Sequence, residues 1–222
     1  MWTDDIRDEF IELFKEKSFT ESGTLEIVGS SFIVNDFKIF GTISEDYANR
    51  EHDWYISQSL NVNNIEGEVP KIWRDIADSK GFINSNYGFL ALSSENGSQF
   101  YNAIKSLQND KSSRQAIMVY TRPSIHVDAF VDGRRDFICT NTQQFILRND
   151  MLNLIVNQRS CDAIYGFRYD MRWASYLLDE AIAILKNSYP NLVRGELILQ
   201  TGSLHIYPRH FKLIEEYINE NS

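Results

Sequence analysis

Cys139 is the first residue whose type could carry chemistry. It lies in the apolar run Asp136-Phe-Ile-Cys-Thr-Asn-Thr, which is typical of a strand. A thiolate is a strong nucleophile, but a cysteine in such surroundings is more often an inert part of the core. Arg159 and Ser160, on the next expected strand, favour the reactive interpretation because a nearby guanidinium stabilises a thiolate. From these residues alone, both interpretations stay open.

The run Gln158-Arg159-Ser160 also has the composition of an anion site. A guanidinium fork and a hydroxyl together match the oxygens of a phosphate group. The net charge of −9, from 31 acidic and 22 basic residues, disfavours binding to the phosphates of nucleic acids. An anionic ligand would therefore depend on local cations, and we expect no nucleic-acid partner.

The spacing of apolar residues predicts the elements that must position these side chains. Helices are predicted at 3–17, 45–58, 70–79, 97–108, 171–187 and 208–219. Strands are predicted at 24–28, 31–34, 37–43, 116–121, 137–147, 152–157 and 197–206, with turns at Asn35-Asp36 and Arg148-Asn149-Asp150. Helices and strands mix without strict alternation, which favours an α/β fold of the mixed α+β kind. We expect a single domain, 1–222, with a mixed β-sheet flanked by helices.

Composition also limits where the protein works. No apolar run reaches the length of a membrane span, and the acidic start Met1-Trp2-Thr3-Asp4-Asp5 is unlike a secretory signal. We therefore expect a cytoplasmic protein with no membrane partner. Its two cysteines, Cys139 and Cys161, are expected to stay reduced. We expect no metal.

Several motifs, in order along the chain, resemble the thymidylate synthase family. The segment Gln158-Arg-Ser-x-Asp162-x-x-x-Gly166-x-x-x-Asp170 resembles the family's Gln-Arg-Ser-x-Asp-x-x-x-Gly-x-x-x-Asn, and Cys139 lies upstream where the family's nucleophile lies. Further resemblances are Arg50-Glu51-x-x-Trp54-Tyr55, Pro70-x-Ile72-Trp73, Tyr87-Gly88, Ser113-Arg114 and His205-Ile206-Tyr207. The resemblance covers roughly residues 22–211 and implies a thymidylate synthase-like fold.

Other stretches are more similar to the phage deoxycytidylate hydroxymethylases within this family. They are Pro70-Lys-Ile-Trp, Ser85-Asn-Tyr-Gly, Tyr120-Thr-Arg-Pro-Ser, Cys139-Thr-Asn-Thr, Gly166-Phe-Arg-x-Asp170 and Gly202-Ser-Leu-His-x-Tyr-x-Arg-His-Phe211. The resemblance implies transfer of a one-carbon unit from 5,10-methylenetetrahydrofolate to carbon 5 of dCMP, with addition of water. The alternatives are a thymidylate synthase or dCMP methylase, a CMP hydroxymethylase, and a degenerate homologue that binds nucleotide without turnover.

Among these alternatives, Asp170 favours those that act on cytosine over those that act on uracil, because thymidylate synthases that use dUMP carry Asn there. A carboxyl group can accept a hydrogen bond from the amino group of cytosine, whereas uracil presents a carbonyl oxygen at that position. The alternative is that Asp170 only caps the helix expected to begin near Met171.

The resemblance implies a role for each matching residue. Cys139 would add to carbon 6 of the base, Glu51 and Tyr87 would hold water and relay protons, and Asp170 would act on the base during catalysis. Substrate binding is implied for Gln158, Arg159, Ser160, Asp170, His205 and Tyr207, with Arg114 reaching the phosphate of a partner subunit. Contact with folate is implied for Asp162, Trp73 and Gly166. Cys161 falls at a variable position and has no implied role.

The implied role of Arg114 requires a homodimer, formed in this family through the sheet. Two departures concern phosphate binding: Gln115 replaces the second arginine of Ser-Arg-Arg, and Thr20-Glu21-Ser22-Gly23 offers no match to the N-terminal phosphate-binding arginine. The sequence also ends soon after His210-Phe211. We expect a more open pocket, in which water adds to the methylene intermediate to give a hydroxymethyl group.

Overall fold

The computed structural model describes residues 1–221, whose contacts group into two compact units. Unit 1 comprises Met1–Ile43 together with the chain from Asn149 onwards, and unit 2 comprises Ser44–Arg148. We describe each unit by itself, and the expectation of a single domain stays a prediction.

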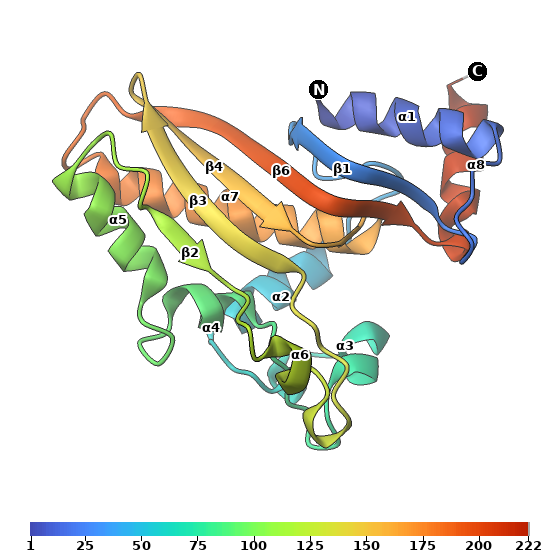
Figure 1. Ribbon diagram of the computed structural model, residues 1–222, viewed down its shortest axis with the longest axis horizontal. Coiled ribbons are helices and arrows are strands. Elements are labelled where there is room, and N and C mark those ends of the chain that lie inside the picture. The colour runs from blue at the N-terminus through green and yellow to red at the C-terminus, as the bar shows by residue number, and fades with distance from the viewer. Residues whose placement is uncertain (222) are drawn as a thin grey trace. The chain divides into compact units, whose positions relative to one another are not determined.

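A mixed sheet forms the centre of unit 1. Its strands are β1 (Leu25–Ile33), β4 (Met151–Gln158), β5 (Cys161–Asp162) and β6 (Val193–Ile206). The long strand β6 pairs antiparallel with β1 and parallel with both β4 and β5. Figure 1 shows β1, β6 and β4 side by side. Parallel and antiparallel pairs in one sheet confirm the predicted mixed α/β class.

Three helices complete unit 1: α1 (Thr3–Lys15), α7 (Tyr165–Leu185) and α8 (Phe211–Glu220), the last preceded by the short turn η3 (Pro208–His210). Helix α7 packs on β4 and β6. Its buried side includes Phe167, Met171, Ala174, Leu177 and Leu178. This is the apolar stripe that the sequence predicts for a core helix. Helices α1 and α8, near the two ends of the chain, lie together (Figure 1).

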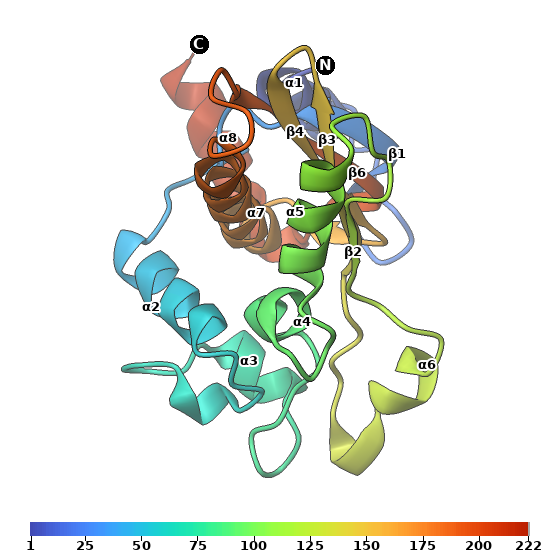
Figure 2. The ribbon, with the colours of Figure 1, turned by 90° about the vertical axis from the view of Figure 1, so that its left-hand side faces the viewer.

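Unit 2 is mainly helical. Its elements are α2 (Glu45–Ile56), η1 (Val62–Asn64), α3 (Lys71–Ile76), α4 (Tyr87–Leu92), α5 (Gln99–Asn109), β2 (Ile117–Val119), α6 (Ile125–Asp128), η2 (Val131–Gly133) and β3 (Thr140–Arg148). Strand β2 pairs antiparallel with β3. Figure 2 shows α4 next to both α2 and α5. A Cβ atom at Gly88 would lie 1.7 Å from the carbonyl oxygen of Tyr55, so the close approach of α4 to α2 requires glycine there.

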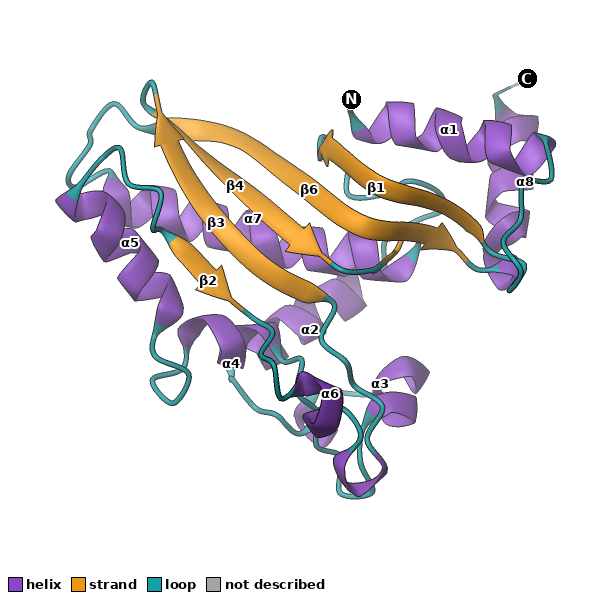
Figure 3. Ribbon diagram, viewed as in Figure 1, coloured by secondary structure: helices purple, strands orange, loops and turns teal. Residues whose placement is uncertain are grey.

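The N-terminal hairpin predicted from 24–34 and 37–43 is wrong. Residues 25–33 form one strand, and the segment from 34 to 43 is irregular (Figure 3). Its carbonyls accept hydrogen bonds from arginine side chains instead of a neighbouring strand: Arg7 Nε donates to Ile39 O at 2.6 Å, and Arg168 donates to Phe40 O. Ile39 and Phe40 are buried, which explains their apolar, strand-like pattern.

Helix α7 begins at Tyr165, six residues before the predicted start at Met171. Asp162 supplies the start, because its Oδ1 accepts from the backbone N–H of Ile164 at 2.8 Å and of Tyr165 at 3.3 Å. Asp170 therefore lies inside the helix. The alternative that Asp170 is its N-cap is wrong.

Further differences concern unit 2. Helices α4 and α6 were not predicted, and Cys139 lies immediately before β3 instead of inside the predicted strand 137–147. Helix α3 is shorter than predicted, with Pro70 at its N-cap position. The other predicted helices and strands are confirmed, with ends that differ by a few residues.

Candidate active site

The Gln158-Arg159-Ser160 run lies where β4 ends in unit 1. Gln158 is the last residue of β4 and is buried, whereas Arg159 is exposed and Ser160 half-buried in the link to β5. The link passes close to β6, because a Cβ atom at Gly202 would lie 2.8 Å from the carbonyl oxygen of Arg159. A glycine at this point of β6 thus lets the backbone of the arginine approach the sheet.

Asp170 and Gln158 are in direct contact. Gln158 Nε2 donates a hydrogen bond of 2.7 Å to Asp170 Oδ2. Burial raises the pKa of Asp170 to about 7, although the bond from Gln158 lowers it, and the nearby charge of Asp162 raises it further. Near neutral pH this carboxyl group is therefore divided between its protonated and ionised forms. It can act either as a hydrogen-bond donor or as an acceptor.

His205 and Tyr207 lie at the end of β6, close to Asp162. Their rings meet edge to face with centroids 4.9 Å apart, and His205 Nδ1 is 3.3 Å from Ser203 Oγ. Burial lowers the pKa of His205, with the charge of Asp162 acting in the opposite direction. The neutral imidazole therefore predominates at pH 7. In that form it carries one donor and one acceptor, as binding of a hydroxyl group requires.

Asp162 has two structural contacts besides any ligand role. Its Oδ1 accepts hydrogen bonds from backbone N–H groups at the start of α7, and its Oδ2 lies 3.6 Å from Arg209 Nη2. The Arg209 guanidinium also lies 4.2 Å from the centroid of the Tyr207 ring. Gly166 is in the first turn of α7, where a Cβ atom would make only an ordinary contact of 3.6 Å with Asp162. Space around the backbone therefore does not require a glycine at this position.

Glu51 of unit 2 is buried on α2, at 5% exposure. Tyr47, one turn earlier, donates its hydroxyl proton to Glu51 Oε1. Trp73 of α3 directs its Nε1–H at Tyr47 Oη, 2.8 Å away, and at Glu51 Oε1, 3.2 Å away. The structure thus brings together Glu51 and Trp73, both predicted to be functional. Sequence reasoning missed Tyr47, although its spacing of four residues from Glu51 on a predicted helix was a usable signal.

A series of aromatic rings connects Trp73 with Tyr87. Ring centroids are 5.1 Å apart for Trp73 and Trp54, 5.4 Å for Trp54 and Tyr55, and 5.7 Å for Tyr55 and Tyr87. Tyr87 also meets Tyr120 edge to face at 5.5 Å. Tyr87, the first residue of α4, is buried at 5% exposure. Such packing fixes the orientation of each ring, and of the hydroxyl group that Tyr87 carries.

Cys139 is half-buried, and its thiol makes a long contact of 3.9 Å with the carbonyl oxygen of Phe137. Asp136, three residues earlier, anchors the segment that leads to the cysteine through hydrogen bonds to its carboxylate. Its carboxylate accepts from the backbone N–H groups of Asn84 and Ser85 and from Ser85 Oγ, the last at 2.7 Å. Burial raises the pKa of Asp136, and these hydrogen bonds lower it.

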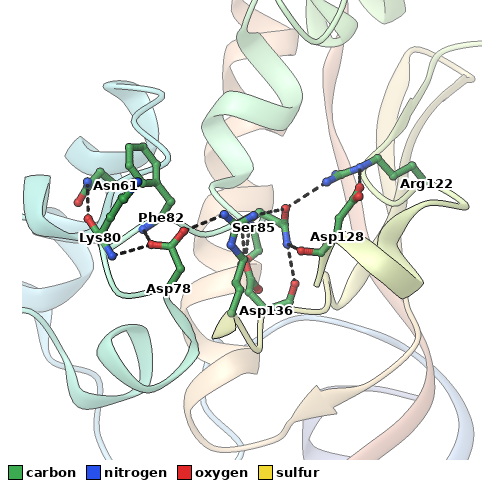
Figure 4. A network of polar contacts seen from close by, with 10 residues as sticks. Asn61, Asp78, Lys80, Phe82, Ser85, Arg122, Asp128 and Asp136 are labelled. Carbon is green, nitrogen blue, oxygen red and sulfur yellow. Dashed lines mark hydrogen bonds and ion pairs between the residues drawn. The ribbon is translucent and has the colours of Figure 1, made fainter. Parts of the chain in front are cut away.

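Asn84 extends this network to two arginines. Its Oδ1 accepts from Arg122 Nη2 and Arg134 Nη1, each at 3.1 Å. Arg122 pairs with Asp128 and Arg134 with Asp78, so each guanidinium has a carboxylate partner. Figure 4 shows Asp136 against Ser85, with Arg122 and Asp128 on one side and Asp78 on the other. Sequence reasoning missed the network because its members are far apart in the chain.

Arg114 is exposed in unit 2. Its carbonyl oxygen accepts from Gln144 Nε2 at 2.8 Å, but within residues 1–221 its guanidinium has no hydrogen bond or ion pair. The predicted trans contact is untested. So is the prediction that Arg159 lies beside Cys139, since these two residues belong to different units.

The described part of the chain contains neither a membrane-spanning helix nor a cluster of metal-ligating side chains. No helix there is both long and apolar enough to cross a bilayer. No three His, Cys, Asp or Glu side chains gather there as a metal site would require.

Known proteins are similar to this chain over most of its length. The family model for thymidylate synthase matches residues 40–222. The deoxycytidylate 5-hydroxymethyltransferase of Enterobacteria phage T2 is 42% identical over 99% of this chain and 92% of that protein. The protein of the same name from phage T4 is also 42% identical, over 98% of this chain and 91% of its own length.

Thymidylate synthases themselves are more distant. That of Buchnera aphidicola is 26% identical over 91% of this chain and 76% of its own length. The family match covers most of the chain, and two relatives exceed 40% identity over nearly all of it. The chain therefore belongs to the thymidylate synthase family.

Proposed function

We propose that this protein is a deoxycytidylate 5-hydroxymethyltransferase. It would transfer the one-carbon unit of 5,10-methylenetetrahydrofolate to carbon 5 of dCMP, and water would complete the hydroxymethyl group. The 42% identity to the phage enzymes over nearly the whole chain supports this choice within the family.

Asp170 is the observation that carries the choice of base. It lies inside α7, where it has no capping role, and Gln158 binds one of its oxygens. Its second oxygen is thereby oriented by a fixed neighbour. A carboxyl group with a pKa of about 7 can accept from the amino group of cytosine and share a proton with ring nitrogen 3. Cytosine, and not uracil, presents this combination of groups.

Cys139 is the proposed nucleophile. Its thiolate adds to carbon 6 of the base, which makes carbon 5 nucleophilic. Carbon 5 then bonds to the one-carbon unit supplied by the folate, and loss of the carbon 5 proton releases tetrahydrofolate from an exocyclic methylene. Water adds to that methylene, and expulsion of the thiolate restores the aromatic ring. The products are 5-hydroxymethyl-dCMP and tetrahydrofolate, with no change in the oxidation level of the folate.

Glu51 and Tyr87 are proposed to handle the water and protons of this sequence. A buried carboxylate that accepts from Tyr47 and Trp73 is held in one orientation, which suits general acid–base catalysis. Tyr87 offers a hydroxyl on a ring fixed by its aromatic neighbours.

The phosphate of the nucleotide is assigned to Arg159 and Ser160, with Arg114 contributed by the second subunit of a homodimer. An exposed guanidinium that forms no hydrogen bond or ion pair with residues 1–221 is available for such a role. His205 and Tyr207 are assigned to the sugar hydroxyl, and Gln158 supports the base-reading carboxyl of Asp170. Gln115 offers no charge, so we expect these two arginines to supply most of the attraction for phosphate.

The folate is assigned to Asp162, Trp73 and Gly166. Asp162 fits a ring that carries an amino group and an N–H, because its carboxylate is only partly buried and accepts hydrogen bonds. Trp73, half-buried, offers an aromatic surface. The folate supplies the one-carbon unit as a co-substrate, while these residues would bind and orient it.

Mass analysis of the products tests the proposal. The purified protein is incubated with methylenetetrahydrofolate and, separately, dCMP, CMP or dUMP. We expect a gain of CH2O on dCMP, together with tetrahydrofolate. Dihydrofolate formed in step with a methylated product would indicate a methylase, and preference for CMP would indicate a ribonucleotide enzyme. Binding of nucleotide without turnover would indicate a degenerate homologue.

A further inference from the structure

We infer that Tyr47 is a positioning residue for the reaction, acting through Glu51. This inference rests on the proposed function, in which Glu51 handles protons and water. Tyr47 matches none of the family motifs recognised in the sequence. Only the structure brings its hydroxyl group to the carboxylate, one turn along α2.

The direction of the hydrogen bonds among Tyr47, Trp73 and Glu51 follows from their chemistry. An indole N–H can only donate, so Trp73 Nε1, at 2.8 Å, donates to Tyr47 Oη. The single hydroxyl proton of Tyr47 is then directed to Glu51 Oε1. Trp73 also contacts that same oxygen at 3.2 Å. Both donors therefore hold Oε1, and two aromatic side chains restrict where this carboxylate oxygen can lie.

The ring of Tyr47 is itself held in place by Arg50. The guanidinium of Arg50 lies 5.6 Å from the ring centroid. Its Nη1 donates to the carbonyl oxygens of Glu66 at 2.6 Å and Glu68 at 3.1 Å, and its Nε pairs with Asp46 at 3.0 Å. The tyrosine thus lies between a fixed cation and the carboxylate, which limits the motion of its hydroxyl group.

Preorganisation of this kind affects the rate more than substrate affinity. Tyr47 helps to keep the Glu51 carboxylate in the position in which it can accept a proton, because its hydroxyl group donates to Oε1. A hydrogen bond to a charged group corresponds to about 10- to 100-fold in rate when it is lost. We therefore expect a lower kcat, with the KM values for dCMP and folate nearly unchanged.

The test begins with Tyr47→Phe, which removes only the hydroxyl group. We expect kcat for 5-hydroxymethyl-dCMP formation to fall about 10- to 100-fold, with KM within about twofold and Tm close to that of the wild type. Tyr101→Phe on α5 is the matched control, because Tyr101 is exposed and lies outside the site. It should leave kcat unchanged. A kcat for Tyr47→Phe within twofold of the control would overturn the inference.

A double-mutant cycle separates positioning from general support of the fold. Glu51→Asp keeps a carboxylate but shortens the side chain by one methylene, which withdraws it from the Tyr47 hydroxyl. If Tyr47 acts through Glu51, Tyr47→Phe should have little further effect on kcat in the Glu51→Asp background. A further loss as large as in the wild type would show that Tyr47 acts independently, and would overturn the inference.

Failure of the proposed function gives different results. If the wild-type protein makes no 5-hydroxymethyl-dCMP, the proposed reaction is wrong. If the wild type is active and Glu51→Gln retains full kcat, the role of Glu51 is wrong, and with it the role of Tyr47. If Glu51→Gln loses activity while Tyr47→Phe keeps it, only the inference about Tyr47 fails.

Discussion

Replacing Asp170 by asparagine changes one hydrogen-bonding atom without changing the shape of the side chain. Gln158 Nε2 donates to one carboxylate oxygen of Asp170 at 2.7 Å. In Asp170→Asn this donor keeps the amide oxygen on its side, so the NH2 group replaces the second oxygen. That NH2 group would face the amino group of cytosine, placing two donors together. Facing uracil, it would meet the carbonyl oxygen and form a hydrogen bond.

The size of the effect follows from the cost of an unsatisfied buried contact. That cost is about 1–3 kcal/mol, which corresponds to about 5- to 160-fold in kcat/KM. We expect kcat/KM for dCMP to fall by such a factor and that for dUMP to rise. If both change by such a factor, the ratio of the two kcat/KM values shifts by about 25-fold to about 25,000-fold.

The assay is a measurement of kcat/KM for dCMP and dUMP, with turnover of either nucleotide followed by tritium release from carbon 5. Asp179→Asn is the control, because Asp179 lies on the same helix, is exposed, and pairs with Arg194 on the surface. It receives the same chemical change away from the site, and its base preference should stay that of the wild type. An unchanged preference in Asp170→Asn would refute the assignment of base recognition to Asp170, and with it the structural argument for deoxycytidylate.

Three further predictions concern the nucleophile, the assembly and the ionisation of Asp170. Cys139→Ala should fold normally and bind nucleotide but lose turnover by about 10⁴-fold or more, whereas Cys161→Ala should stay active. Calorimetry would measure folding and binding, and turnover assays would measure activity; reversed phenotypes would contradict this prediction. Mixing inactive Arg114→Ala with inactive Cys139→Ala should restore partial activity through mixed dimers, and a fully active monomer in sedimentation would exclude the trans role. Because burial raises the pKa of Asp170 to about 7, its folded form binds more protons than the unfolded chain between about pH 4 and 7, so this residue's contribution to stability is lost as pH rises. The Tm of Asp170→Asn minus that of the wild type should therefore increase from pH 5 to pH 8, and a difference that does not vary with pH would contradict the raised pKa.

Local sequence was enough to predict several elements of this protein. Ser44 accepts from the backbone N–H of Tyr47, and the helix α2 that follows has the predicted start. The buried stripe of α7 was readable because its residues repeat at helical spacing. The segment from Gln158 to Asp170 was informative through its resemblance to the family motif, whereas the hydrogen bond between Gln158 and Asp170 is seen only in the structure.

The tertiary structure decided what depends on partners distant in the chain. The buried segment around Ile39 and Phe40 is irregular, and not a strand, because Arg7 and Arg168 bind its carbonyl groups. Asp136 is tied to Asn84 and Ser85 across about fifty positions of sequence, as the carboxylate of a buried residue must find donors wherever the fold brings them. Periodicity and propensity describe interactions within one helix or strand. They carry no information about which remote side chain will satisfy a buried polar group, so those contacts emerge only when the chain is folded.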